Sequence, residues 1–507
     1  MTDDDHPPSD EPADSGSWWS RDCGGRYVLA IAMPLVISTA SWTVMNFIDR
    51  MFLLWHDKNE MAAALPAGML LFALICFPLG VASYVNTFVA QYVGAGRPKQ
   101  VGRVVWQAVF IGVASVPLLV ALAPLAEWFF SFAGHDEAVA VHEVTYLQIL
   151  TFGAGAMVIS AAMSAFFTGR GKTRTVMIVD SSANLLNVVL DVLWIFGIAG
   201  FPELGIAGAA LATVVSQWFK VACYWCLMMR KEHRETYGVV SGRRLDLPLM
   251  GRLLRFGGPN GLQLFVDVAA FTVFILLIGQ LGPDAILATT LAFNVNSVAF
   301  VPMFGVGIAV STIVGQQLGR NRPDMAARAT WTAFTIAAVY TGLMGLLYVS
   351  IPDAFLFGHA LGIDAAQFAP LRDTVVVLLR FVAVYCIFDA MNIIFVSAIK
   401  GAGDTRFILL TAMITSPLPV IVGYLGIRFY NQELLWCWVV LTAWIVSLGL
   451  IYFARFLQGR WRTMRVIEPE LVAVALAESV ETEPTEDEEL AATETAVACE
   501  RHGASRR

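Results

Sequence analysis

Long apolar stretches separated by short polar connections recur along almost the whole chain. A helix that crosses a membrane needs ~20 mostly apolar residues, because the hydrocarbon core of a bilayer is about 30 Å thick. Twelve stretches meet this requirement: 27–54, 66–92, 104–126, 142–168, 175–199, 204–229, 253–281, 285–315, 328–351, 374–399, 407–429 and 434–458. Each is continuously apolar, whereas strands of membrane barrels alternate apolar and polar residues. The pattern therefore predicts an all-α membrane protein with twelve transmembrane helices.

Composition supports this prediction and argues against a soluble globular fold. Apolar residues make up 57% of the 507 positions, charged residues only 14%, and the mean hydropathy is +0.66. Soluble domains carry about 25% charged residues. The net charge of −7 indicates nothing about a ligand, because the two ends, 1–26 and 459–507, hold 18 of the 40 acidic residues. We expect a lipid bilayer around the apolar surface and no nucleic-acid partner.

Basic residues divide the connections between the predicted helices into two sets. They are frequent after the even-numbered helices and sparse after the odd-numbered ones. The longest connection, after the sixth helix, is the most basic and includes Arg230, Lys231, Arg234, Arg243 and Arg244. Because Lys and Arg concentrate in cytoplasmic loops, we expect the even connections and both termini to be cytoplasmic.

The two halves of the chain share marked residues at an offset of 225 positions. The matched pairs are Pro34 and Pro259, Gly80 and Gly305, Gln91 and Gln316, and Gly94 and Gly319. The offset covers six helices, an even number, so both halves should cross the membrane in the same direction. We predict two six-helix bundles, 27–229 and 253–458, joined by a basic cytoplasmic linker, 230–252, with a polar cytoplasmic tail at 1–26 and an acidic, disordered cytoplasmic tail at 459–507. Repeat-built transporters place their sites near mid-membrane.

Five carboxylates stand out inside predicted helices, where a charge costs at least ~2.5–3.5 kcal/mol and usually serves function. They are Asp49, Asp180, Asp191, Asp267 and Asp389. Asp180 is close to the cytoplasmic end of its helix, and we interpret it as a group satisfied by a neighbouring helix or by interfacial water. Lys220, in the next helix, is expected to extend its charged end toward the cytoplasm.

Asp49 and Asp191 lie in the outer parts of two helices that both run outward. Asn187 is one turn before Asp191, on the same helix face. Carboxylate and carbonyl oxygens are the ligands that hard cations such as Na⁺ prefer, and a carboxyl in a low-dielectric setting can carry a proton instead. The residues leave the choice between Na⁺ and H⁺ open.

Asp267 and Asp389 are the deepest carboxylates. Asp267 is twelve residues from cytoplasmic Arg255 and Asp389 eleven from cytoplasmic Lys400, which at 1.5 Å per residue places both near mid-membrane. Polar residues within a turn of them on the same helices are Gln263, Tyr385 and Asn392. We predict that these residues line one polar pocket in the C-terminal half, in which Asp267 and Asp389 bind a cation or proton and Gln263, Tyr385 and Asn392 line the substrate cavity.

Several stretches resemble one known transporter family. They are 34–49, 91–96, 187–191, 205–213, 256–259 and 401–406. In this order, and with a six-plus-six repeat of helices, they resemble the multidrug and toxic compound extrusion (MATE) transporters over 27–458. The resemblance implies a V-shaped pair of bundles with alternating access.

The same resemblance implies a cation site in the N-terminal bundle, with Na⁺ as one candidate ion. The matching residues are Asp49, Asn187, Asp191 and Thr213. In the sodium-driven branch, helices 7 and 10 supply further acids and a tyrosine, and Asp267, Asp389 and Tyr385 match those positions. The helix 7 residue is usually Glu, so Asp267 is a departure with a shorter side chain.

We expect a secondary antiporter that exports organic cations or amphipathic drugs in exchange for Na⁺ or H⁺, with no enzymatic activity and no cofactor. No Walker-type phosphate-binding sequence is present. The alternative is a flippase for lipid-linked saccharide precursors of the same broad superfamily, which would favour a cationic cavity for pyrophosphate. We expect a monomeric, multi-pass protein of the bacterial inner membrane.

Overall fold

The computed structural model describes residues 17–133, 137–360, 365–430 and 433–468. Within these ranges the regular structure is entirely helical. In this part of the chain, twelve helices or helix pairs are long and apolar enough to cross a membrane, which confirms the predicted number. The predicted polar tail up to residue 16 and the predicted acidic tail from residue 469 lie outside the described residues.

The first six spans form the N-terminal bundle. Its helices are α1 (Gly25–His56), α2 (Lys58–Gly94), α3 (Pro98–Ala121), α4 (Ala126–Ala133), α5 (Glu137–Thr168), α6 (Thr173–Ile195) and α7 (Ile206–Met228). The short α4 continues the span of α3 after a 3₁₀ turn at Ala123–Leu125. Pro124 has no N–H group to continue the helical ladder, which accounts for the break. Helix α8 (Lys231–Thr236) follows in the basic connection.

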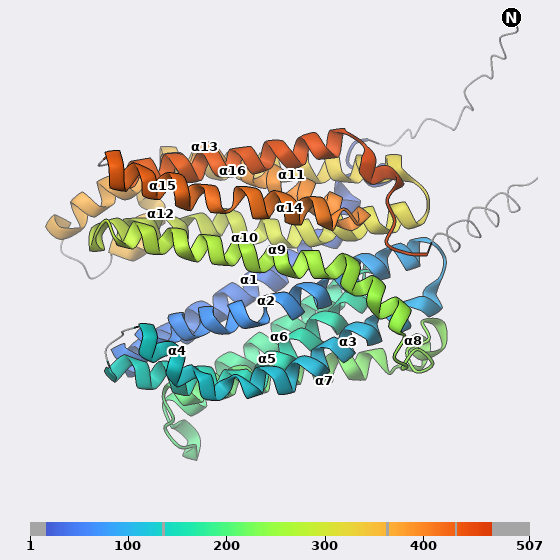
Figure 1. Cartoon of the computed structure of the whole chain (residues 1–507), viewed down its shortest axis with the longest axis horizontal. Helices are drawn as coiled ribbons and strands as arrows, with labels where there is room; N and C mark the ends of the chain where they lie inside the picture. The colour runs from blue at the N-terminus through green and yellow to red at the C-terminus, as the bar shows by residue number, and fades with distance from the viewer. Residues whose placement is uncertain (1–16, 134–136, 361–364, 431–432, 469–507) are drawn as a thin grey trace, which may run out of the picture.

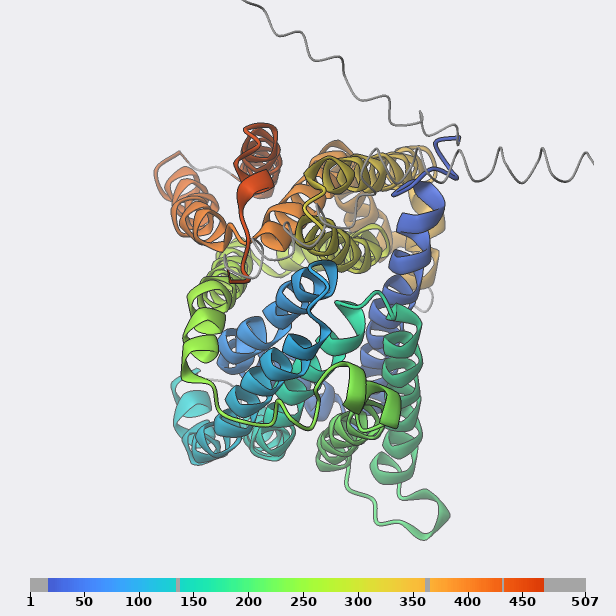
Figure 2. The same ribbon diagram turned by 90° about the vertical axis from the view of Figure 1, so that its right-hand side faces the viewer.

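The last six spans form the C-terminal bundle. Its helices are α9 (Leu247–Gly279), α10 (Pro283–Gly319), α11 (Pro323–Ser350), α12 (Pro352–Ala360), α13 (Ala365–Ala402), α14 (Thr405–Thr415), α15 (Pro417–Tyr430) and α16 (Leu434–Leu457). Helices α14 and α15 together make one span, broken where Pro417 follows Ser416. Figures 1 and 2 show the two bundles lying against each other with their helices roughly aligned.

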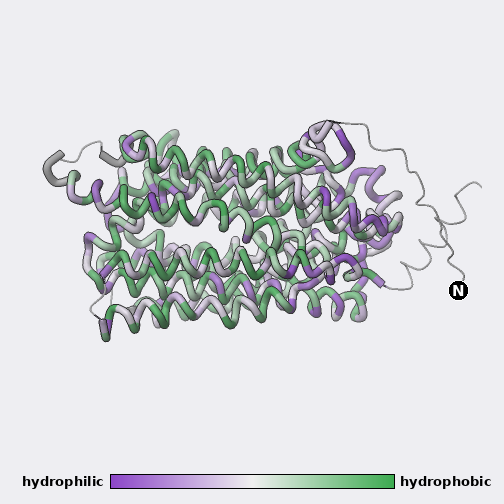
Figure 3. Tube along the Cα trace, turned by 90° about the horizontal axis from the view of Figure 1, so that it is seen from above, coloured by the Kyte–Doolittle hydropathy of each residue, from purple (hydrophilic) through white to green (hydrophobic). Residues whose placement is uncertain are grey.

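The positions of the hydrophobic cores show that the two bundles form a V. One hydrophobic core runs through both bundles at the end that carries the basic connections, which we call the basic end. At the opposite end each bundle has a separate core, which draws on residues of one bundle only. The bundles are therefore joined at the basic end and separate at the other, as the family resemblance implied. In Figure 3 the hydrophilic segments gather most densely toward the basic end, and hydrophobic residues dominate along the helices.

Glycines from both repeats permit the close approach of the bundles at the basic end. A Cβ atom added to Gly94 would collide with the Gln316 carbonyl, and one added to Gly319 would collide with the Gln91 carbonyl. Nearer the middle of α2 and α9, Gly80 and Gly261 lie against each other in a similarly close contact. Small residues at such positions let helix backbones approach closely.

Two repeat-related glutamines tie the bundles together with hydrogen bonds that mirror each other. Gln91 Nε2 donates to the carbonyl of Gly401 over 3.0 Å. Gln316 Nε2 donates to the carbonyl of Gly169 over 2.8 Å. Each glutamine thus reaches from the second span of its own bundle to the end of the fourth span in the other bundle.

The chain after α16 also lies across both bundles. Val466 N–H donates to Gln91 Oε1 over 2.8 Å, and Glu468 accepts from Tyr92 over 2.8 Å and pairs with Arg252 at 2.9 Å. Trp461 is buried and stacks on Phe456. The sequence analysis placed residues 459–468 in the C-terminal tail. In the structure they pack against the two bundles, because apolar side chains such as Trp461 and Val466 are buried at the junction.

Candidate functional site

Two carboxylates come together in the outer half of the N-terminal bundle. Asp49 on α1 is 8% exposed and Asp191 on α6 is 0% exposed, and the two are close enough to interact electrostatically. One oxygen of each, Oδ1, is buried and has no hydrogen-bond partner among the described residues. Burying a charge is very costly unless it is paired, so this pair can accept a cation or a proton.

Amide and hydroxyl groups complete this pair. Asn187 lies one turn before Asp191. Its side-chain amide, oriented so that both atoms have partners, donates to Asp191 Oδ2 over 3.2 Å and accepts from the Thr213 backbone N–H over 3.2 Å. The Thr213 hydroxyl lies 3.4 Å from the same amide group. The structure thus brings together all four residues that the resemblance assigned to a cation site, from α1, α6 and α7.

The sequence reasoning missed Tyr146, a fifth residue at this place. Tyr146 on α5 is buried and interacts electrostatically with both Asp49 and Asp191. Nothing in the apolar stretch around Tyr146 marks it, because helix periodicity does not fix which neighbour a helix face meets. Its depth in the outer half of its helix is the only signal that could have suggested it.

Asp267 forms a second polar group, in the C-terminal bundle. It accepts hydrogen bonds from Gln263 over 2.5 Å and from Ser416 over 3.1 Å, and it interacts electrostatically with Lys400. Ser416 stands at the break between α14 and α15, so the proline that interrupts this span also positions a donor. Gln263 was predicted; Ser416 was not.

Asp389 lies in a third polar group, on α13. Its partner is Asn392, one turn further along the helix. Tyr385, one turn earlier, is buried, and its hydroxyl has no hydrogen-bond partner among the described residues. No hydrogen bond joins Asp389 to Asp267 within the described part of the chain. The two acids therefore belong to separate hydrogen-bonded groups, and a shared substrate cavity stays a prediction.

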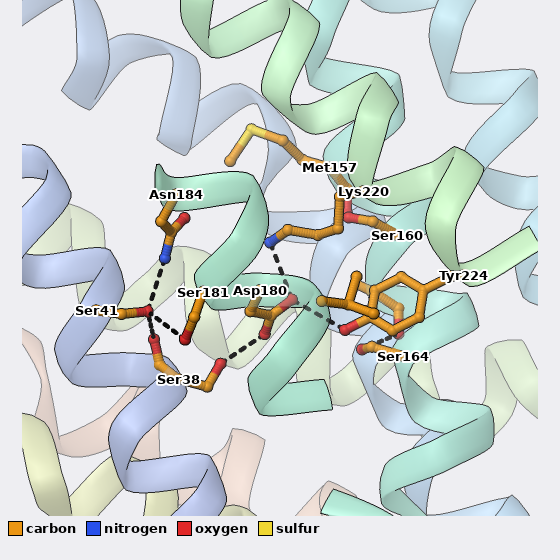
Figure 4. A network of polar contacts seen from close by, with 12 residues as sticks. Ser38, Ser41, Met157, Ser160, Ser164, Asp180, Ser181, Asn184, Lys220 and Tyr224 are labelled. Carbon is orange, nitrogen blue, oxygen red and sulfur yellow. Dashed lines mark hydrogen bonds and ion pairs between the residues drawn. The ribbon is translucent and has the colours of Figure 1, made fainter. Parts of the chain in front are cut away.

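Asp180 is satisfied by neighbouring helices, as predicted. Its carboxylate accepts from Ser38 over 2.6 Å and from Tyr224 over 2.9 Å. The expectation for Lys220 was wrong: its ammonium does not extend to the cytoplasm but lies 3.3 Å from Asp180 (Figure 4). The Asp180 carboxylate compensates the positive charge of Lys220 inside the span, so the ammonium does not need to extend into water.

The protein consists of two matched six-helix bundles, and each bundle has polar groups and carboxylates inside its spans. These features are typical of membrane transporters. The comparison with protein families agrees with this class. The MatE family model matches residues 34–193 and 259–425. The chain belongs to this family, the multidrug and toxic compound extrusion transporters, and is not an enzyme.

Relatives and solved structures cover most of the chain. It is 31% identical over 402 residues to the multidrug resistance protein NorM of Burkholderia vietnamiensis, covering 79% of this chain and 84% of the relative. It is 24% identical over 450 residues to a probable multidrug resistance protein NorM of Thermotoga maritima, and the match covers 88% of this chain and 95% of the relative. A transporter of the MOP superfamily from Pyrococcus furiosus has the same fold, with a TM-score of 0.77 at 17% identity. The match covers 87% of this chain and 97% of the Pyrococcus chain.

Proposed function

We propose that this transporter exports organic cations or other amphipathic drugs in exchange for Na⁺ or H⁺. The relatives from Burkholderia vietnamiensis and Thermotoga maritima bear the name of multidrug resistance proteins, which supports the substrate class. The observation that carries the proposal is the Asp49–Asp191 pair, with one unpartnered buried oxygen on each residue. Intramembrane carboxylates of this kind mark ion pathways.

The chemistry of the pair suits either coupling ion. Carboxylate oxygens from Asp49 and Asp191, the amide oxygen of Asn187 and the hydroxyl of Thr213 are all hard oxygen ligands, which Na⁺ requires. A proton would need only one of the two carboxylates. Among the described residues there is no group of three or more His, Cys, Asp or Glu side chains that could hold a metal ion, so a site for a soft transition metal is not indicated.

The two bundles supply the movement that exchange requires. With the basic connections in the cytoplasm, both termini lie inside and the joined end of the V faces the cytoplasm. The described arrangement is then open to the outside, where ions enter and drugs leave. Rocking of the bundles about their junction would open the basic end and expose the sites to the cytoplasm.

The polar groups of the C-terminal bundle are the proposed contacts for a cationic substrate. Asp267 with Gln263, and Asp389 with Asn392 and Tyr385, offer negative charge and hydrogen-bonding atoms among apolar helices. An ion bound in the N-terminal bundle and a drug bound in the other need not touch. Their exchange follows if the ion stabilises one arrangement of the bundles and the drug the other. We propose a monomer in the bacterial inner membrane as the working unit.

The test is dye efflux from proteoliposomes under an imposed Na⁺ gradient or an imposed pH gradient, applied separately. Wild type should export an organic cation dye under at least one gradient, and Asp49→Asn or Asp191→Asn should abolish this efflux. Asp284→Asn removes an exposed carboxylate of α10 and should transport as wild type. Unchanged efflux in both variants of the pair would refute the proposed mechanism, and saccharide-lipid flipping without dye efflux would favour the flippase.

A further inference from the structure

The polar residues of α6 form one continuous stripe along the helix. Asp180, Asn184, Asn187 and Asp191 follow each other at spacings of four, three and four residues, which places them on one helix face. Apolar Ile178, Leu185 and Val189 on the same helix are exposed and suited to face lipid. The stripe therefore runs inside the bundle, and a carboxylate stands at each end of it.

Helix α1 supplies hydroxyl groups along the same stripe. Ser38 donates to Asp180 over 2.6 Å. Ser41 accepts a hydrogen bond from the Asn184 side chain over 2.8 Å. Figure 4 shows these serines on α1 facing α6. These hydrogen bonds between α1 and α6 extend from Asp180 to Asn184. Asn187, one turn further along the same face of α6, hydrogen-bonds to Asp191 at the outer end of the stripe.

An ion pair stands at the inner end of this stripe. The Lys220 ammonium lies 3.3 Å from Asp180 Oδ1, and the two side chains are only 16% and 18% exposed. Tyr224, one turn after Lys220 on α7, donates to the same carboxylate over 2.9 Å. Buried ion pairs contribute little net stability compared with apolar residues of similar size. Stability alone thus gives a poor account of a charged pair within the membrane.

The Asp180–Lys220 ion pair lies between the outer carboxylates, Asp49 and Asp191, and the cytoplasmic end of the bundle. At 1.5 Å per residue, Asp180 is about 10 Å from the start of α6 at the basic end, and Asp191 about 16 Å beyond it. In depth, Asp180 thus lies between the Asp49–Asp191 pair and the basic end, and a cation moving inward along α6 would pass it.

We propose that Asp180, Lys220, Tyr224 and Ser38 form an inner station through which the coupling cation leaves the Asp49–Asp191 pair toward the cytoplasm. The inference rests on the proposed function and adds a route to it. The Lys220 ammonium is a tethered cation that occupies Asp180 at rest. The coupling cation displaces it, passes on to the cytoplasm, and Lys220 returns. While Lys220 is in place, Asp180 does not attract cations, which keeps the route closed between cycles.

The main test removes the station without leaving a buried charge. The double variant Asp180→Asn/Lys220→Met is compared with wild type in three measurements: ion-induced release of bound dye in detergent, dye exchange between the two sides without an ion gradient, and ion-driven dye efflux. Release and exchange should be unchanged, and ion-driven efflux should fall by about tenfold or more, equivalent to a barrier at least 1.4 kcal/mol higher. The control Asp404→Asn/Arg455→Met removes a buried ion pair of the C-terminal bundle and should retain ion-driven efflux.

The single variant Lys220→Met provides a readout that a structural role would not change. Without the tethered cation, Asp180 is open to ions, so proteoliposomes should show uptake of the coupling ion in the absence of dye. Asp180→Asn/Lys220→Met should not show this leak. No leak in Lys220→Met, together with wild-type efflux in the double variant, would overturn the inner station.

Two further comparisons separate the possible failures. Tyr224→Phe keeps the ring that stacks on Phe167 and removes only the hydroxyl. Tyr224→Phe should slow ion-driven efflux severalfold, and it tests the station independently if the double variant does not fold. A wild-type rate of efflux in Tyr224→Phe would count against the station. An absence of ion-driven efflux in wild type itself would instead refute the proposed function.

Discussion

The buried acids of this protein differ in how their charge is compensated. Asp49 and Asp191 each keep an unpartnered oxygen, whereas Asp404 holds Arg455 at 2.7 Å and accepts a second hydrogen bond from it over 2.8 Å. Asp404 lies between α13 and α14 at the basic end, where its pair with Arg455 can join neighbouring segments, whereas the free oxygens of Asp49 and Asp191 can accept a ligand. We therefore propose that Asp404 stabilises the fold and that Asp49 and Asp191 serve transport; Asp180 is paired like Asp404, but its pair lies within the spans of α6 and α7.

Arg455→Met is predicted to destabilise the protein because it leaves the buried Asp404 carboxylate without its cation. Breaking such pairs in soluble proteins costs about 3–5 kcal/mol, so the melting temperature in detergent should fall clearly. Asp404→Asn/Arg455→Met should recover most of the loss. Arg462→Met, whose pair with Asp324 is exposed, should melt as wild type. Equal melting of Arg455→Met and Arg462→Met would contradict this assignment.

Residue types and spacing indicated Asp49, Asn187 and Asp191 as candidates, and the family resemblance added Thr213, but neither predicted all the contacts around them. Asp49, Asn187 and Asp191 stand out because polar groups inside apolar stretches are rare. Tyr146 did not stand out, and although Asp180 and Lys220 did, their pairing was not predicted. Whether two side chains meet depends on how each helix is rotated against its neighbour, and that rotation is set by packing across the bundle, which a single sequence does not contain.

The spans themselves were well predicted, and their interruptions were not. Hydrophobic length identifies each span, but α1 and α9 continue through Pro34 and Pro259, whereas the third and eleventh spans break at Pro124 and Pro417. Membrane helices tolerate proline where neighbouring groups satisfy the freed carbonyls. Because those groups come from other helices, the sequence around a proline does not tell which outcome occurs.

Close contact between α2 and α9 makes Gly261 sensitive to substitution. A Cβ atom at Gly261 would collide with the Phe77 carbonyl, whereas one at Gly258, three residues earlier on α9, would meet no atom within 4 Å. Gly261→Val should therefore separate the two helices, lower the melting temperature and reduce efflux. Gly258→Val is the matched control and should behave as wild type. Similar melting of the two variants would show that the helices do not approach this closely in the membrane.

At the scale of the whole molecule, the junction of the bundles is what distinguishes one end from the other. The shared hydrophobic core, the close contacts of Gly94 and Gly319, and the paired glutamine hydrogen bonds all lie at the basic end. In the proposed mechanism this junction opens and reforms during transport, so its contacts should set the balance between the two arrangements.

Gln91→Ala and Gln316→Ala together are predicted to shift this balance toward an arrangement open at the basic end. Spin labels at Arg234→Cys and Leu457→Cys, in a background without native cysteines, report the separation of the bundles there. The double alanine variant should show a larger population of long distances than either single variant. Identical distance distributions in wild type and the double variant would mean that the glutamines do not hold the junction.

The central claim is that a cation at Asp49 and Asp191 drives release of the drug. The most direct measurement is anisotropy of a fluorescent organic cation bound to the purified transporter while Na⁺ is raised or the pH lowered, with KCl keeping ionic strength constant. The account predicts dye release by one of these ions in wild type and in Asp284→Asn, and no release in Asp191→Asn. Equal release from wild type and Asp191→Asn, or none from wild type by either ion, would contradict it.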